Sequence, residues 1–122
     1  MKSNKGFSFL ARLKSFTHAW RGIRSFLVTE HNAWIHLAGT VAVVALGMIT
    51  DVNKNEAIIL IIVTGLVWIT EMLNSAIEKM IDFVSTEHRE EIRYIKDISA
   101  AAVLVSATVA LVAGCIIFIP KF

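Results

Sequence analysis

Long apolar segments alternate with short polar ones along most of the chain. The apolar segments start near Ala33, Ala57 and Ile98. The second is almost purely apolar as far as Ile69, and the third carries no charge over residues 98–119. A helix needs about 20 residues to cross the hydrocarbon core of a bilayer. The pattern therefore predicts an all-α membrane protein with three spans, at about 33–50, 57–77 and 98–119.

The segment before the first span, residues 7–32, has the pattern of an amphipathic helix. Apolar residues such as Phe9, Phe16 and Trp20 recur at helical spacing, while Lys14 and Arg21 occupy other faces. A basic helix with aromatic residues on its apolar side is typical of the membrane interface. We expect a surface helix here, joined to the three spans in a single domain covering residues 1–122.

The composition agrees with a membrane protein and disfavours other classes. Hydrophobic residues make up 56% of the chain, and the mean hydropathy is +0.66. Both values are high for a soluble domain of this size. The basic residues lie beside apolar segments without a recognisable nucleic-acid-binding module, so we expect no nucleic-acid partner. Cys115 is the only cysteine, which excludes a disulfide within the chain.

The basic residues predict the topology. Six Lys and Arg residues, Lys2 and Lys5 among them, precede the first span, whereas the loop after it holds only Lys54. The loop between the second and third spans is again basic, with Lys79, Arg89, Arg93 and Lys96. Segments rich in Lys and Arg remain on the cytoplasmic side. The N-terminus and the 79–97 loop of a protein in the bacterial cytoplasmic membrane are therefore predicted to face the cytoplasm.

Four polar residues interrupt the apolar pattern toward the end of the second span: Glu71, Asn74, Glu78 and Asp82. Steps of three, four and four place them on one helical face. Ionisable groups at membrane depth are costly, and they tend to line a protein-protected or watery site. The carboxylates of Glu71 and Glu78 and the amide of Asn74, converging on this face, predict a site for metal binding and proton transfer.

Residues near this face could complete a phosphoryl-transfer site. Glu30 and Glu78 are expected at similar depth, so they could share one Mg²⁺, an ion that commonly binds one or two carboxylates together with substrate phosphates. Phosphoryl transfer also needs a positive group for the phosphates and a base near the accepting hydroxyl. Lys96 could supply the first, and Glu71, deeper and less solvated, could supply the second.

Simpler interpretations exist for most of these residues. A carboxylate at a helix end is often only solvated, and Lys96 and Asp97 could form no more than a charge pair at the start of the third span. For His36, a hydrogen bond between helices is favoured over metal ligation. Trp68 is interpreted as an interface or packing aromatic, and Ser99 as a small packing residue.

The polar face also carries a family resemblance. The stretch Glu71-Met-Leu-Asn-Ser-Ala-Ile-Glu78-x-x-x-Asp82, followed after 13 residues by Lys96-Asp97, resembles the signature E-[LIM]-x-N-[ST]-A-I-E-x-x-x-D of the bacterial integral-membrane diacylglycerol kinase family. The resemblance extends over nearly the whole chain. The stretch Glu30-His-Asn-x-x-Ile-His36 is similar to the undecaprenol kinase branch, although Trp34 stands where that branch usually has Arg. Ile95-Lys-Asp-Ile-Ser-Ala replaces the A-K-D-x-G-S-A of the diacylglycerol-specific branch.

The resemblance implies a homotrimer that phosphorylates a membrane lipid alcohol with MgATP at the cytoplasmic face. It implies that Glu71 is the general base, that Asn74 positions Glu71 or a phosphate, and that Glu30 and Glu78 bind Mg²⁺. Nucleotide contacts would come from Lys96, Asp97 and Asp82.

The resemblance leaves two acceptors nearly even, with a slight preference for diacylglycerol, giving phosphatidic acid, over undecaprenol. The competing hypothesis is a non-catalytic assembly or ion-conducting subunit of the membrane. A conduit needs polar residues across the whole membrane, whereas the polar cluster here is one-sided.

Overall fold

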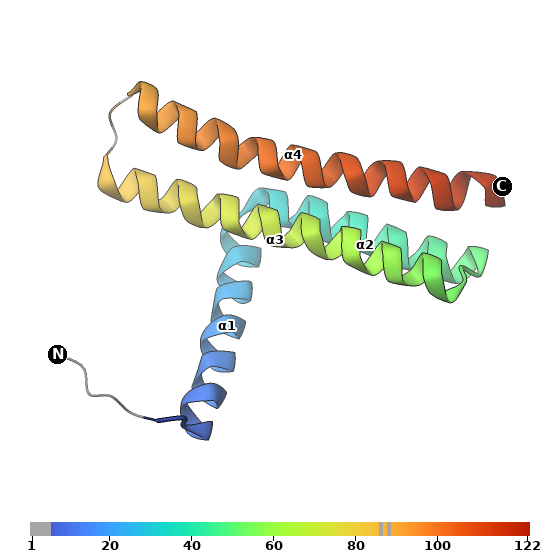
Figure 1. Ribbon diagram of the computed structural model, residues 1–122, viewed down its shortest axis with the longest axis horizontal. Coiled ribbons are helices and arrows are strands. Elements are labelled where there is room, and N and C mark those ends of the chain that lie inside the picture. The colour runs from blue at the N-terminus through green and yellow to red at the C-terminus, as the bar shows by residue number, and fades with distance from the viewer. Residues whose placement is uncertain (1–5, 86, 88) are drawn as a thin grey trace. The chain divides into compact units, whose positions relative to one another are not determined.

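The computed structural model describes residues 6–85, 87 and 89–122, and this part of the chain forms four α-helices (Figure 1). They are α1 (Phe9–Thr29), α2 (His31–Thr50), α3 (Lys54–Val84) and α4 (Glu90–Phe118), with a short 3₁₀ turn η1 (Ile119–Lys121). The last three helices are each long and apolar enough to cross a membrane. The predicted class, an all-α protein with an N-terminal helix and three apolar helices, is confirmed. Lys2 and Lys5, which contribute to the predicted topology, lie outside the described residues.

Helix α1 belongs to a compact unit that ends at His31, and α2, α3 and α4 form a second unit. The Ser8 hydroxyl caps α1 by accepting a hydrogen bond from the Ala11 N–H at 3.3 Å. The side chains of Phe16 and Trp20 on α1 are exposed, as a helix in a membrane interface requires. Extended backbone at Glu30 ends the helix.

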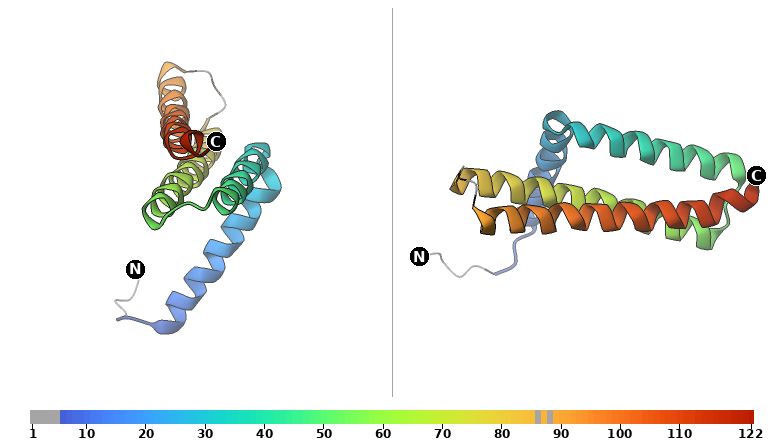
Figure 2. Two further views of the ribbon diagram at one scale, coloured as in Figure 1. Left: turned by 90° about the vertical axis from the view of Figure 1, so that its right-hand side faces the viewer. Right: turned by 90° about the horizontal axis from the view of Figure 1, so that it is seen from above.

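The helices of the second unit run antiparallel to their neighbours in the chain, and both figures show α3 and α4 side by side (Figures 1 and 2). A capping box starts α3, because the Asn53 side chain accepts from the Glu56 N–H at 2.8 Å and the Glu56 carboxylate accepts from the Asn53 N–H at 3.1 Å. With 31 residues, α3 is about 46 Å long, which exceeds the roughly 30 Å of a hydrocarbon core. Part of α3 must therefore extend beyond the membrane.

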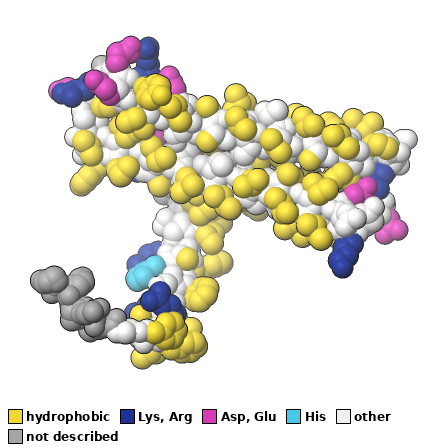
Figure 3. All heavy atoms as spheres, in the orientation of Figure 1, with side chains coloured by type: hydrophobic (Ala, Val, Ile, Leu, Met, Phe, Trp, Pro, Cys, Tyr) yellow, Lys and Arg dark blue, Asp and Glu magenta, His cyan; other side chains and the backbone are white. Residues whose placement is uncertain are grey.

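Polar and apolar side chains are distributed as a membrane requires. Hydrophobic side chains cover the middle of the α2–α4 unit on the face seen in Figure 3, and charged side chains gather at its two ends. The core cluster is small, consisting of Leu60, Ile117 and Phe118, while many large apolar side chains such as Ile61 and Leu111 are exposed. These exposed side chains would face lipid. At the end where α3 begins, Lys121 forms an ion pair with Glu56 at 3.1 Å.

Candidate active site

The polar face predicted from the sequence lies on one continuous helix, α3, and its exposure increases along the chain. Glu71 is buried, with 3% of its surface exposed. Asn74 and Glu78 are half-buried, and the Asp82 side chain is 61% exposed. From Glu71 to Asp82 the face covers about 16 Å along the helix axis. The same face therefore connects a protected interior position with an open one.

The carboxylate of Glu71 is paired with a histidine of the neighbouring helix. The His36 Nε2 lies 3.2 Å from Glu71 Oε1, and the two side chains are 17% and 4% exposed. An ionised carboxylate can only accept a hydrogen bond, so with Glu71 ionised the donor in this pair is the Nε2–H of His36. The predicted interhelical hydrogen bond of His36 is confirmed, and its partner is the residue proposed as the base.

A second hydrogen bond joins the same two helices one turn away. The Trp68 indole N–H donates to the Thr40 hydroxyl at 2.8 Å, and that hydroxyl donates to the His36 carbonyl oxygen at 2.7 Å. The rings of His36 and Trp68 are 6.2 Å apart. Trp68 is therefore more than the packing aromatic that the sequence indicated, because its indole fixes α3 against α2 beside Glu71.

The amide of Asn74 is held from the other side, by α4. The Ser99 hydroxyl donates to Asn74 Oδ1 at 2.6 Å, and Ser99 itself is buried. This arrangement leaves the Asn74 amide N–H groups available as donors to an anion. The interpretation of Ser99 as a small packing residue was incomplete. A further link between α3 and α4 is the pair of Thr70 and Ser106 hydroxyls, 2.7 Å apart.

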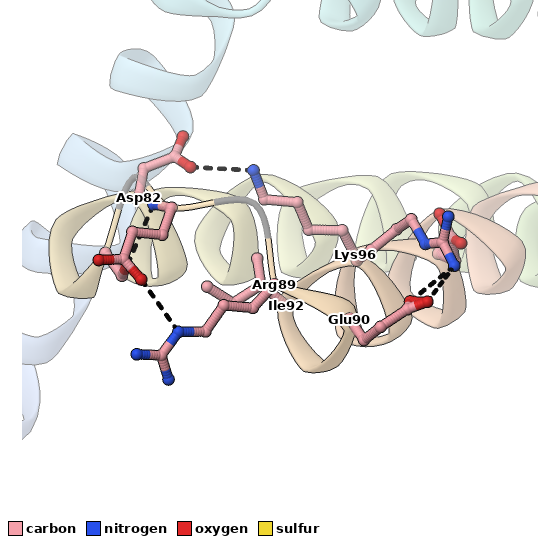
Figure 4. A pocket seen from close by; sticks show the side chains of 9 residues that line it. Asp82, Arg89, Glu90, Ile92 and Lys96 are labelled. Carbon is pink, nitrogen blue, oxygen red and sulfur yellow. Dashed lines mark hydrogen bonds and ion pairs between the residues drawn. The ribbon is translucent and has the colours of Figure 1, made fainter.

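A polar pocket lies at the end of the α2–α4 unit where α3 connects to α4. Its volume is about 630 Å³, and Figure 4 shows Asp82 and Lys96 at one side, joined by an ion pair of 2.9 Å. Lys96 thus pairs with Asp82 of α3. Asp97 also lines the pocket, and the remaining lining residues are Ser85, Glu87, Arg89, Glu90, Ile92 and Arg93. The pocket therefore contains all three residues predicted to contact the nucleotide.

An apolar groove of about 650 Å³ lies between α2, α3 and α4. His36, Thr40 and Trp68 line it together with apolar side chains such as Leu111 and Phe118. The groove therefore extends along the membrane-spanning part of the unit and includes the histidine that contacts Glu71.

The predicted Mg²⁺ ligands fit that ion in chemistry. Glu78 is half-buried on the α3 face. Glu30 ends α1, in the first compact unit. Among the described residues, no group of three or more His, Cys, Asp or Glu side chains is close enough to hold a metal. Since Mg²⁺ needs only one or two carboxylates when substrate phosphates complete its shell, this donor set is compatible with the ion. The shared ion stays a prediction.

Comparison with known proteins identifies the family to which the chain belongs. Residues 17–118 match the model of the family described as prokaryotic diacylglycerol kinase. The chain belongs to this family. It is 36% identical to the undecaprenol kinase of Bacillus subtilis (strain 168) over 108 residues, 88% of each chain. It is also 30% identical to the diacylglycerol kinase of Escherichia coli (strain K12) over 120 residues, 98% of each chain.

Membership of the family makes the chain a multi-pass membrane protein of a lipid kinase family. Because this is a family of kinases, membership favours an enzyme over the competing hypothesis of a non-catalytic subunit. All seven residues predicted for the site, Glu30, Glu71, Asn74, Glu78, Asp82, Lys96 and Asp97, lie within the matched segment. ATP and a lipid substrate follow from the family.

Proposed function

We propose that this protein transfers the γ-phosphate of MgATP to the hydroxyl of a long-chain lipid alcohol, with undecaprenol as the first candidate acceptor. The observation that carries the proposal is the position of Glu71. Its carboxylate is 4% exposed and bonded to His36, which lines an apolar groove, while the same helix face continues to a polar pocket. An acceptor hydroxyl and a nucleotide could therefore approach one helix from two different phases.

The lipid side of the proposal depends on the groove between α2, α3 and α4. Its apolar walls suit a hydrocarbon or isoprenoid chain, and its polar members His36 and Thr40 lie near Glu71 in the fold. Undecaprenol is favoured over diacylglycerol by the Glu30-His-Asn-x-x-Ile-His36 stretch and by the Bacillus subtilis relative named undecaprenol kinase. This reverses the slight preference for diacylglycerol drawn from the sequence. Diacylglycerol is the second candidate, supported by the Escherichia coli relative that matches nearly the whole chain.

The nucleotide side depends on the polar pocket. Lys96 is 37% exposed there and can turn from Asp82 to a phosphate group, for which its ammonium is a strong donor. Asp82 and Asp97 then remain available for contacts to the rest of the nucleotide. The pocket is open to water, where ATP is dissolved.

The proposed reaction is an in-line displacement at the γ-phosphorus. Glu71 takes the proton of the acceptor hydroxyl while the hydroxyl oxygen forms a bond to the γ-phosphorus. The bond from the γ-phosphorus to the bridging oxygen of ATP breaks, and ADP leaves with that oxygen. The amide N–H groups of Asn74 would donate to the transferring phosphoryl group or to Glu71. Glu30 and Glu78 would hold Mg²⁺, which neutralises phosphate charge when bound.

Two further parts of the proposal concern assembly and orientation. The chain would act as a homotrimer, as the family resemblance implies. Its N-terminus and the 79–97 loop would face the cytoplasm, because the basic residues concentrate there. That orientation places the polar pocket on the side where ATP is made available.

The test uses purified full-length protein in mixed micelles with MgATP and matched amounts of undecaprenol, diacylglycerol or glycerol. We expect kcat/KM to be at least about 10-fold higher for undecaprenol than for diacylglycerol, which corresponds to about 1.4 kcal/mol of discrimination. A preference for diacylglycerol would assign the second candidate. Turnover of glycerol at a rate above both lipids would overturn the lipid assignment.

A further inference from the structure

We propose that His36 is a positioning residue for Glu71: its Nε2–H holds one carboxylate oxygen so that the other is presented to the acceptor hydroxyl. The inference rests on the proposed role of Glu71 as the base. It assigns a function to a histidine that the reaction scheme above does not use. The argument comes from the contact, from the support behind the ring, and from the burial of both groups.

The contact is a hydrogen bond in a protected place. Nε2 and Oε1 are 3.2 Å apart, and the exposed fractions are 17% for His36 and 4% for Glu71. In the part of the chain that the structure describes, His36 is the side chain that hydrogen-bonds Glu71. A buried carboxylate without a donor would be strongly destabilised. The bond uses one oxygen of Glu71, so the second oxygen remains for the acceptor.

A second hydrogen bond between α2 and α3 lies next to the contact of His36 with Glu71. His36 and Thr40 are four residues apart on α2, and Trp68 and Glu71 are three apart on α3, so each pair shares a helix face. The hydrogen bonds His36–Glu71 and Trp68–Thr40 therefore lie one turn apart and both join the antiparallel helices α2 and α3. The backbone of His36 is tied into the same set, because its carbonyl accepts from Thr40. The imidazole itself lies beside Glu71 and the Trp68 ring, whose centroid is 6.2 Å away, and this placement restricts the direction of its N–H.

A base must lie within hydrogen-bond reach of the proton that it takes. Misplacing a reacting group by about 1 Å can reduce a rate by about 10²-fold. Glu71 has three rotatable side-chain bonds, and the bond from His36 removes much of that freedom before substrate binds. If His36 were only a packing residue, its shape would matter and its N–H would not.

The experiment compares His36→Gln, His36→Leu and wild type in the lipid kinase assay. Glutamine places an amide N–H at about the reach of Nε2, whereas leucine has similar bulk and no donor. We expect His36→Gln to retain kcat within about 3-fold. We expect His36→Leu to lose about 10- to 100-fold in kcat while KM for MgATP changes less than about 2-fold. The matched control is His18→Leu, which removes an exposed histidine of α1.

A second readout does not require turnover. Full-length protein is labelled with ¹³C at the glutamate carboxyl carbons, and the Glu71 signal is assigned by its loss in Glu71→Gln. The signal should move in His36→Leu and stay near its wild-type position in His36→Gln. This measurement keeps the pairing testable in any variant that folds, as judged by size-exclusion chromatography.

Three results would overturn the inference. The first is equal loss of kcat in both His36 variants, which would indicate a role of shape alone. The second is full activity in His36→Leu, and the third is an unmoved Glu71 carboxyl signal in that variant. A wild-type protein that phosphorylates no lipid alcohol would instead overturn the proposed function, and the carbon signal alone would then report whether the pair exists.

Discussion

The substitution Glu71→Gln separates chemistry from structure at this site. Glutamine has nearly the same size as glutamate, so it leaves no cavity at a position that is only 3% exposed. Its amide oxygen can still accept the N–H of His36, which lies 3.2 Å from Oε1 in the native protein. The substitution therefore keeps the contact between α2 and α3, and it removes the negative charge of the side chain together with its ability to take a proton.

The expected magnitudes follow from this difference. Loss of a general base lowers a rate by about 10²–10⁴-fold, which is about 2.7–5.4 kcal/mol in activation free energy. The change in the free energy of unfolding should stay below about 1 kcal/mol, because a neutral hydrogen bond replaces a charge-assisted one in the same geometry. The KM for MgATP should stay within about 2-fold, because the pocket with Lys96 lies toward the other end of the α3 face.

The assay measures kcat and KM for MgATP with a saturating lipid alcohol, and thermal unfolding is followed on the same sample. The matched control is Glu56→Gln, the same substitution at the far end of α3, where Glu56 pairs with Lys121. This control should retain wild-type kcat. A Glu71→Gln protein with kcat within about 5-fold of wild type would refute the role of Glu71 as base. A large fall in thermal stability would refute the claim that glutamine preserves the contact.

The remaining predictions concern the ion, the amide and the nucleotide. Glu30→Gln and Glu78→Gln should each raise the Mg²⁺ concentration for half-maximal rate, because each removes a carboxylate ligand; an unchanged metal titration in both would contradict the shared ion. Ser99→Ala should lower kcat about 10-fold, because the hydroxyl that donates to Asn74 is lost, whereas Ser99→Thr keeps a hydroxyl and should retain part of the activity. If the Ser99→Ala variant and the wild type had equal kcat, Ser99 would be only a packing residue. Lys96→Met should raise KM for MgATP about 10- to 100-fold, measured by steady-state kinetics, and an unchanged KM would place the phosphates elsewhere.

The sequence predicted the helices and the polar face because both depend on short-range patterns. An apolar run of sufficient length is helical in a bilayer wherever it packs. The spacing of Glu71, Asn74, Glu78 and Asp82 fixes a common face as soon as the segment is a helix. These properties need no knowledge of neighbouring helices.

The partners of these residues could not be predicted in the same way. The contacts of Ser99 with Asn74 and of His36 with Glu71 depend on the positions of α4 and α2 along the axis of α3. Apolar side chains permit many such registers with similar burial. The available signal was the presence of polar groups within each apolar helix, since buried polar groups are usually hydrogen-bonded to one another. Each helix has several such groups, so several pairings were possible.

The graded exposure of the α3 face has a consequence for substrates that never share a solvent. Lifting a lipid out of the bilayer into water would cost about 0.8 kcal/mol for each CH₂ that leaves the membrane, which is on the order of tens of kcal/mol for a long chain. Under the proposed function such an extraction is unnecessary. A hydroxyl needs to reach only the depth of Glu71 while its chain stays in the membrane. The nucleotide would enter from water near Asp82, about three helical turns away, and its triphosphate would extend along the α3 face toward the hydroxyl. The phosphorylated product then keeps its anchor and leaves by lateral diffusion.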